Sequence, residues 1–520
     1  MIKRNYIKFF YLTKIIAQLI VYTLLISLII LPIWLNKKFG DVYFDQFILN
    51  AQLAWHGYLG GDHVLVSSFY KWMLLIPFLL SILLIFIKFL IYDISSNRQI
   101  LTNTIKIIFI RAIGYLIHFK VFKILLYLFQ KKIEILILIL LIIISFYFNS
   151  LIFQSIKINS KNDFIDQNYI KVNFFNPSLF NKNLIVLYVE SFENTYGNEN
   201  LFGENLLLNL MTEDQSERSI KKYIQVTGYG YTLASLVATQ CGIPLKPLSI
   251  LSSSNTEFFN KFLPNADCLT DILKKSGYYN IFITSDDLVR SGFKNYTSSH
   301  NFDEAYGLDE LYKLGIKTSK SAWHDKNKFY GGVHDDDLLK FTLNKIKEID
   351  KKKNKYFFTI FTLDTHAPSG YFNPKCNIKI KTYDIKDVVV CTTLAIEKFI
   401  KEFKNLNLQN TNLVVLGDHL FMNGADGFNN DEYFNTSERY VFNKFISVDK
   451  FTFNRDYMNF FDLFPSLIEF TGQKIKDGRL GLGLSVFNDL NKEKNIFSEN
   501  DFLIKLEGDS KLYNELWIKK

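Results

Sequence analysis

The apolar residues of this chain follow two patterns, and the first lies in its N-terminal part. Long apolar runs with few charges cover residues 15–35, 72–90 and 135–153. Each run is close to the ~20 residues that an α-helix needs to cross a bilayer. No small-residue cleavage site follows the first run and more runs come later, which disfavours a removable signal peptide. The pattern predicts an integral, multi-pass membrane domain, residues 1–154, with about three transmembrane helices.

Residues 105–129 form a further apolar stretch that charged and polar side chains interrupt. Because charges are costly in the hydrocarbon core, we expect this stretch to be an amphipathic helix at the membrane interface. The alternative is a fourth span, which would place the N-terminus outside if the C-terminal domain stayed outside. The interrupting residues are Lys106, Arg111, His118, Lys120 and Lys123.

From about residue 180 the apolar runs become short and alternate with helical stretches. The run 184–189 is rich in branched residues and typical of a buried strand, and similar runs occur at 281–284, 356–363 and 413–416. Helical stretches at 336–349 and 392–403 lie between them. This alternation predicts an α/β domain with a mostly parallel sheet over residues 183–520, preceded by a linker over residues 155–182.

The charge pattern bears on topology. The formal net charge is +9, and several basic residues flank the apolar runs, ahead of the first and between the second and third. Those segments should therefore be cytoplasmic. With three spans, everything after about residue 155 would lie outside the cytoplasmic membrane. No arginine-rich patch with interleaved aromatic residues stands out in the C-terminal part, so we expect no nucleic-acid partner.

The four cysteines all lie in the C-terminal domain, at positions 241, 268, 376 and 391. Two disulfides would fit an oxidising compartment, although four unrelated buried thiols remain the alternative at this point. A structural zinc site is disfavoured because the sequence has no C-x-x-C pair.

Polar side chains follow three of the predicted strands at the point where each strand ends. Glu190 follows the first strand, Asp364 and His366 follow the third, and Asp418 and His419 follow the fourth. Ligands gather at the carboxyl ends of parallel strands, and carboxylate and imidazole groups suit a divalent metal. Taken singly, each residue could instead be a helix cap, a turn or an ordinary loop residue. Their shared position predicts a site.

Thr232 is the candidate nucleophile. It follows the glycine-containing turn at residues 228–231 and precedes a helical stretch, so it would lie at a helix N-terminus. Backbone donors and the helix dipole favour a phosphate there. A metal bound to the hydroxyl would favour its alkoxide. The alternative is that Thr232 is a plain helix cap.

Three motifs carry a resemblance to a known family: GYGYTLASLVATQCGIP at 228–244, LYVESFENTY at 187–196 and GDHLFMN at 417–423. They resemble the phosphoglycerol transferase I family of the alkaline phosphatase and sulfatase superfamily. Lipoteichoic acid synthases and lipid A phosphoethanolamine transferases belong to the same superfamily. The likeness extends from about residue 183 to 485 and implies a sulfatase-like α/β fold for the C-terminal domain.

The resemblance also implies roles for particular residues. It makes Thr232 the nucleophile, and it makes Glu190, Thr232, Asp418 and His419 the ligands of one divalent cation, which could be manganese, zinc or magnesium. His366, in LDTHAP, matches a histidine that contacts the substrate phosphate or protonates the leaving group.

The resemblance is looser in other places. His334, in YGGVHD, matches only approximately and would be a second, weaker substrate contact; the alternative is a solvated residue that opens the following helix. The cysteine contexts favour pairing Cys241 with Cys268 and Cys376 with Cys391. Sulfate-ester hydrolysis is disfavoured, because the C/S-x-P-x-R motif of that chemistry is absent around Cys241.

The resemblance implies a phosphotransferase anchored in the cytoplasmic (inner) membrane with its catalytic domain in the periplasm. We expect it to move phosphoglycerol from phosphatidylglycerol through a covalent Thr232 intermediate to an extracytoplasmic glycan such as a periplasmic glucan. Diacylglycerol would be released. The alternative is phosphoethanolamine or lipoteichoic-acid-type transfer with the same metal site. An inactive membrane scaffold would require missing ligands, and every aligned position is filled.

Overall fold

The chain folds into two compact units, a helical N-terminal unit and a larger α/β unit. The computed structural model describes residues 2–39, 63–95, 139, 141–143, 164–172, 176–226, 230–246, 261–289, 291–316, 332–367, 370–378, 385–421, 438–488, 506 and 510–517. The predicted amphipathic stretch 105–129 lies outside these residues. Most of the predicted third span, 135–153, does so as well.

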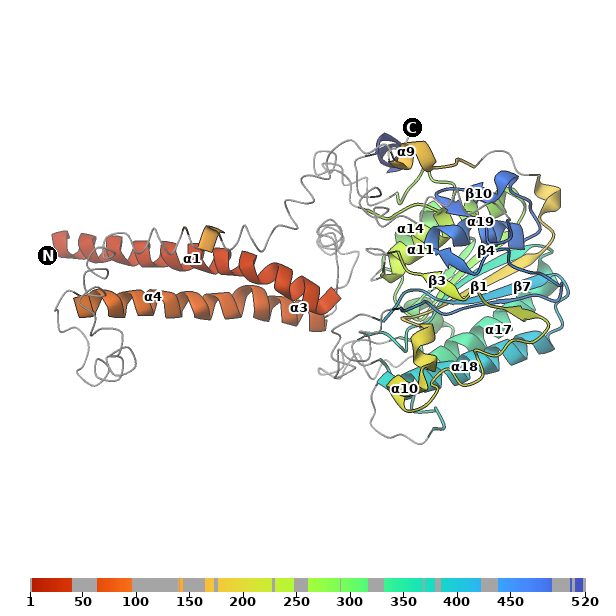
Figure 1. Cartoon of the computed structure of the whole chain (residues 1–520), viewed down its shortest axis with the longest axis horizontal. Coiled ribbons are helices and arrows are strands. Elements are labelled where there is room, and N and C mark those ends of the chain that lie inside the picture. The colour runs from red at the N-terminus through yellow and green to blue at the C-terminus, as the bar shows by residue number, and fades with distance from the viewer. Residues whose placement is uncertain are drawn as a thin grey trace. The chain divides into compact units, whose positions relative to one another are not determined.

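Two long helices make up most of the described part of the N-terminal unit (Figure 1). The first is α1 (Ile2–Phe39), and the second runs continuously through α3 (His63–Tyr70), a π-helical turn η1 (Lys71–Leu75) and α4 (Ile76–Ser95). Thr13–Trp34 in the first helix and Ser67–Lys88 in the second are long and apolar enough to cross a membrane. They coincide closely with the first two predicted spans.

Polar side chains join these two helices. Ser27 Oγ donates to the carbonyl oxygen of Met73 in η1 at 2.6 Å. Hydrogen bonds of this kind fix the pairing of apolar helices, whose hydrophobic surfaces alone do not select one register in lipid. Three more link Thr23 to Ser81, Trp34 to Ser68, and Lys88 to Gln18.

A seven-stranded sheet forms the centre of the α/β unit, in the order β2-β8-β7-β1-β6-β4-β5. Strands β7, β1, β6, β4 and β5 pair in parallel, whereas at one edge β8 pairs antiparallel with β7 and β2 pairs antiparallel with β8. The prediction of a mostly parallel sheet is therefore confirmed. The strands are β1 (Asn183–Val189), β2 (Glu217–Arg218), β4 (Tyr279–Thr284), β5 (Glu304–Tyr306), β6 (Tyr356–Phe361), β7 (Thr411–Gly417) and β8 (Asn443–Ile446).

Helices cover both faces of this sheet (Figure 1). Successive side chains of a strand point to opposite faces, so Val186 and Tyr188 of β1 enter one core while Ile185 and Leu187 enter the other. The first core contains α11 (Thr232–Cys241), α13 (Leu269–Lys275), α14 (Phe293–Ser299) and α19 (Phe460–Phe470). The second contains α10 (Glu199–Phe202), α15 (Leu308–Lys313), α17 (Asp335–Lys352) and α18 (Ile385–Asn405). Both faces are buried, which explains why β1 is apolar throughout.

Part of the predicted linker belongs to the α/β unit. Ile165 in α9 (Phe164–Asn168) and Phe180 are buried in its core, and Ile170 pairs with Gly481. The C-terminal helix α21 (Lys511–Trp517) packs beside α9. Two small sheets complete the unit, β3 (Lys222–Ile224) with β9 (Tyr457–Asn459) and β10 (Arg479–Leu480) with β11 (Gly483–Leu484).

Candidate active site

The carboxyl ends of β7, β1 and β6 lie side by side, and polar residues follow each of them. The backbone N–H of Asp418 donates to the carbonyl oxygen of Val189 (3.0 Å), which brings the end of β7 against the end of β1. Asp418 Oδ1 then accepts a hydrogen bond from the backbone N–H of Ser191 (2.8 Å). Ser191 has a φ of 49°, an unusual value for a non-glycine residue, and its hydroxyl donates to Glu190 Oε1 (2.7 Å). Two of the candidate site residues, Glu190 and Asp418, therefore hold the turn after β1 in place.

Four predicted residues come together at this edge. His419 Nε2 lies 3.4 Å from Glu190 Oε1 and 3.5 Å from Asp418 Oδ2. Thr232 Oγ1 lies 3.4 Å from Glu190 Oε2. Ligand atoms of Glu190, Asp418 and His419 all lie within 4.8 Å of one another, and the three residues are buried. The fold thus brings together residues that are up to 229 positions apart in the sequence (190 to 419).

The residues of this cluster fit a divalent cation. Two buried carboxylates face each other, and Asp418 Oδ2 accepts no hydrogen bond from the described residues. Burial and the nearby Glu190 raise the pKa of Asp418 to about 7. Burial opposes a charge on His419, but Asp418 and Glu190 outweigh it and raise the pKa of the imidazole. A positive ion would relieve this repulsion and use the lone pairs of Asp418 Oδ2.

The orientation of His419 supports the same interpretation. Its Nδ1 donates to the carbonyl oxygen of Leu420 (2.9 Å), which leaves Nε2 directed at the carboxylates. Such a second hydrogen bond commonly fixes the tautomer of a ligating histidine.

Thr232 is the first residue of α11, as predicted. Tyr231 before it is extended and makes no side-chain cap, so no side chain at the N-cap takes up the first-turn N–H donors. Gly230, two residues before Thr232, lies against the side chain of Gln225, since a Cβ on Gly230 would lie 2.4 Å from Nε2 of Gln225. Gln225 Oε1 also accepts from the backbone N–H of Leu420 (2.7 Å). Gln225 therefore bridges the turn that carries Thr232 and the loop that carries His419.

The two predicted substrate histidines lie near the end of β6 and the start of α17, respectively. His366 Nδ1 donates to the carbonyl oxygen of Ala367 (2.7 Å), and the hydroxyl of Thr365 donates to the backbone oxygen of Glu190. His334 immediately precedes α17, as the helix-opening alternative expects. However, its ring is only 16% exposed and its Nδ1 lies 2.9 Å from Asp364 Oδ1, so it is not a solvated residue.

Comparison with known proteins identifies the fold. Residues 182–472, more than half of the chain, match the family model described as Sulfatase. The chain belongs to the sulfatase family. This membership agrees with the fold that the motifs imply, and it places the Thr232 cluster in the matched region.

Several relatives of this sulfatase-family chain carry a more specific name. Phosphoglycerol transferase I of Citrobacter koseri is 33% identical over 257 residues, and the protein of the same name from Salmonella arizonae is 32% identical over 257 residues. Each alignment covers 48% of this chain but 32% of the relative. The matched region is thus about a third of the relatives' length.

The chain is also similar to solved structures that are more distant in sequence. The lipoteichoic acid synthase LtaP from Listeria monocytogenes is 14% identical with a TM-score of 0.46, covering 63% of this chain and 80% of its own. The phosphoethanolamine transferase EptA from Neisseria meningitidis is 12% identical with a TM-score of 0.44, covering 88% and 84%.

An ion pair that the sequence analysis missed supports the chain just after His419. Glu193 is fully buried, and Arg439 Nε donates to its Oε2 at 2.9 Å. The backbone N–H of Phe421 donates to Glu193 Oε1 (3.1 Å), and Arg439 Nη2 donates to the Phe421 carbonyl oxygen (2.8 Å). The pair therefore fixes the chain two residues beyond His419. The only sequence signal was the second glutamate of VESFE.

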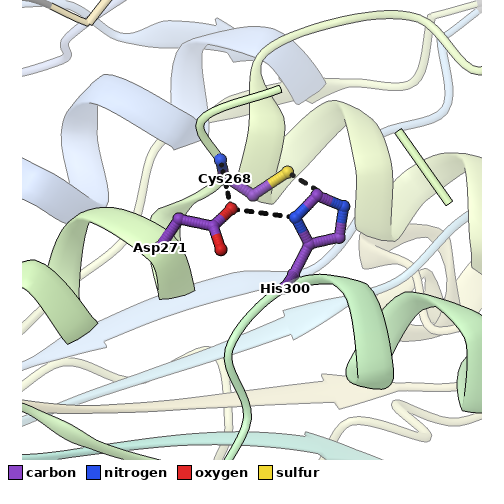
Figure 2. Close-up of side chains that lie close together, drawn as sticks. All are labelled: Cys268, Asp271 and His300. Carbon is purple, nitrogen blue, oxygen red and sulfur yellow. Dashed lines mark hydrogen bonds and ion pairs between the residues drawn. The ribbon is translucent and has the colours of Figure 1, made fainter. Parts of the chain in front are cut away.

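The two disulfides are those that the resemblance implies, Cys241–Cys268 and Cys376–Cys391. The first joins the last residue of α11 to the residue before α13. Figure 2 shows that Asp271 and His300 lie beside Cys268, with His300 Nδ1 2.8 Å from Asp271 Oδ2. Because the Cys268 sulfur is already in a disulfide, we interpret this second cluster as a buried hydrogen-bonded support of the disulfide rather than a metal site.

Proposed function

We propose that this protein is a metal-dependent transferase that moves a phosphoglycerol head group from phosphatidylglycerol to an extracytoplasmic glycan. The observation that carries the proposal is the position of Thr232. Its hydroxyl lies at the N-terminus of α11 and 3.4 Å from Glu190, within a buried cluster that fits a divalent cation. The relatives named phosphoglycerol transferase I support this choice of head group.

In the first step of the proposed reaction, Thr232 Oγ has lost its proton to solvent and attacks the phosphorus of the lipid phosphodiester as an alkoxide, the form in which the second step releases it. Glu190, Thr232, Asp418 and His419 would hold a divalent ion, whose positive charge would favour the threonine alkoxide and offset charge on the phosphate. The bond from phosphorus to the diacylglycerol oxygen breaks, and His366 supplies the proton for that oxygen. The N–H groups in the first turn of α11 stabilise the nonbridging oxygens. Phosphoglycerol is then esterified to Thr232.

In the second step, a hydroxyl of the acceptor attacks the same phosphorus and the bond to Thr232 Oγ breaks. His366, now neutral, takes the proton of the acceptor hydroxyl. The threonine is regenerated, and the glycan gains a phosphodiester-linked glycerol. A periplasmic glucan is the acceptor class that we propose.

The proposed location is the cytoplasmic (inner) membrane, with several membrane passes and the α/β unit in the periplasm. Two helices long enough to span a bilayer and two disulfides in the α/β unit support it. Tethering an active site to the membrane raises the effective concentration of a lipid donor at the bilayer surface.

The test uses the full-length protein in detergent or nanodiscs, loaded with manganese, zinc or magnesium in separate samples. Each sample is incubated with phosphatidylglycerol or phosphatidylethanolamine and a soluble glucan, and the products are analysed by mass spectrometry. We expect diacylglycerol and glycerophosphoryl-glucan from phosphatidylglycerol, with no product from the Thr232→Ala variant. Reaction with phosphatidylethanolamine alone would show a phosphoethanolamine transferase instead. Turnover of neither lipid with any of the three metals would overturn the proposal.

A further inference from the structure

His334 belongs to a hydrogen-bonded network of two aspartates outside the Glu190–Asp418–His419 cluster. Its Nδ1 lies 2.9 Å from Asp364 Oδ1, and Asp364 Oδ2 accepts the backbone N–H of Asp335 at 3.0 Å. Both aspartates are buried. Each oxygen of Asp364 thus has a partner from the segment that opens α17, and the histidine ring is held on one side.

Asp335 in turn braces Asp364. Its Oδ1 accepts the backbone N–H groups of Leu363 (3.0 Å) and Asp364 (3.2 Å), and its Oδ2 is 2.9 Å from the hydroxyl of Thr392 in α18. The start of α17, the end of β6 and α18 are therefore locked together by one carboxyl group. Such a fully satisfied buried network leaves its members little freedom to move.

This network lies at the same sheet edge as Thr232. The backbone N–H of Val333 donates to the carbonyl oxygen of Ser285, just beyond β4 (3.1 Å). A Cβ on Gly332 would lie 2.6 Å from a side-chain carbon of Leu363 and 3.0 Å from the Ser285 oxygen. The chain before His334 therefore passes closely over the ends of β4 and β6. Because β6 is the neighbour of β1, His334 lies on the β4 side of Glu190.

The charges around His334 favour an imidazolium. Burial opposes it, but Asp364, Asp335 and Asp337 together raise the pKa of His334. Asp337 also forms an ion pair with Lys375, which reduces the contribution of Asp337 to the raised pKa of His334. Burial and Asp364 raise the pKa of Asp335, which favours its neutral form.

Burial also raises the pKa of Asp364, and the hydrogen bond with His334 opposes that rise. An ionised Asp364 and a charged His334 cancel, which is the least costly arrangement for these two buried groups. Among the described residues, Nε2 of His334 makes no hydrogen bond and is the nitrogen left for a ligand.

We propose that Asp364 is a positioning residue, braced by Asp335, that holds His334 as a doubly protonated imidazolium whose Nε2–H binds a nonbridging oxygen of the donor phosphodiester. The substrate in this statement rests on the proposed function. Asp364 does not touch the substrate; it fixes the orientation and the charge of a residue that does. A neutral His334 with Nδ1–H bonded to Asp364 would offer a lone pair to the anionic phosphate, which would repel it.

The first test measures His334 directly and needs no turnover. Full-length protein with ¹³C-labelled histidine is titrated by NMR, and the His334 signal is assigned from its loss in His334→Gln. We expect a pKa above the ordinary histidine value in wild type and a lower one in Asp364→Asn. Asp336→Asn is the matched control, since Asp336 lies on the same turn of α17 but pairs with Lys398 at the surface. An ordinary pKa in wild type overturns the proposal, and this holds even if Asp364→Asn does not fold.

The second test measures the pH profile of phosphatidylglycerol turnover. Because its pKa is raised, His334 stays charged up to a higher pH. The charge is lost as the pH rises through that pKa. Asp364→Asn should therefore move the alkaline limb to lower pH and reduce kcat/KM at pH 7 by about tenfold or more. Adding Asp364→Asn to His334→Gln should cost little further, because both act through the same ring.

The two proposals can fail separately. A wild type that turns over neither lipid overturns the proposed function, while the NMR titration still decides the role of Asp364. In an active enzyme, the positioning role alone is overturned if Asp364→Asn leaves the alkaline limb unchanged and the losses of Asp364→Asn and His334→Gln are additive.

Discussion

Replacing Thr232 by alanine should separate the chemistry of this site from the stability of the fold. Thr232 begins α11, where alanine is a better helix former by ~0.6 kcal/mol. The lost contact is a long one, 3.4 Å from Oγ1 to Glu190 Oε2. We therefore expect the free energy of unfolding to change by no more than about 1 kcal/mol. Urea unfolding followed by circular dichroism measures this.

Activity should respond very differently to the same change. Removing a nucleophile that forms a covalent intermediate should reduce turnover by about 10⁴-fold or more, which is about 5 kcal/mol of transition-state stabilisation. Thr232→Ser keeps the hydroxyl and loses the methyl group that restricts its rotamer, so we expect a loss of about tenfold or less. Metal content should persist in both variants, since Glu190, Asp418 and His419 remain.

The intermediate itself can be trapped. Wild type incubated with head-group-labelled phosphatidylglycerol and no acceptor should carry label on the peptide that contains Thr232, with diacylglycerol released in parallel. The alanine variant should carry none. If Thr232→Ala transfers phosphoglycerol at the wild-type rate, the covalent mechanism and the assignment of the nucleophile are both refuted.

Three further changes test the surrounding structure. Asp418→Asn should lower the metal content measured by elemental analysis, because it removes an ionised oxygen ligand; full metal occupancy would exclude Asp418 as a ligand. Replacing Cys376 and Cys391 by serine should cost about 3 kcal/mol of unfolding free energy under non-reducing conditions, given their separation of 15 residues, and no change would contradict a stabilising disulfide. Arg439→Met should destabilise the domain by about 3–5 kcal/mol, because Glu193 would stay buried without its partner; adding Glu193→Gln should restore part of the loss, and purely additive costs would argue against the pair.

Resemblance to a known family and the positions of strand ends together predict the core of the candidate site from the sequence alone. Runs such as 184–189 and 413–416 are apolar throughout, which is typical of strands covered on both faces, and all four predicted strands are present in the sheet. Once the strands are parallel, their carboxyl ends must share one edge, so Glu190 and Asp418 could be expected to meet. The motif around Thr232 supplied the candidate nucleophile, and its catalytic role stays a prediction. The strands and the meeting of Glu190 with Asp418 could be predicted because strand periodicity and strand ends are local properties of the sequence.

The parts that only the tertiary structure decided depend on partners far apart in the chain. Arg439 reaches Glu193 across 246 positions, and Gln225 reaches the backbone of Leu420 across 195. No local pattern specifies such pairs, because the order β7-β1-β6 is set by how the layers pack. One feature of the sequence hints that Asp335 is buried: it lies on the apolar face of α17 with Leu338 and Leu339. Its bracing role depends on the end of β6 and on Thr392 of α18 lying beside it in the fold. Because the Asp335 carboxyl group is buried, its hydrogen bonds hold these elements and the start of α17 together.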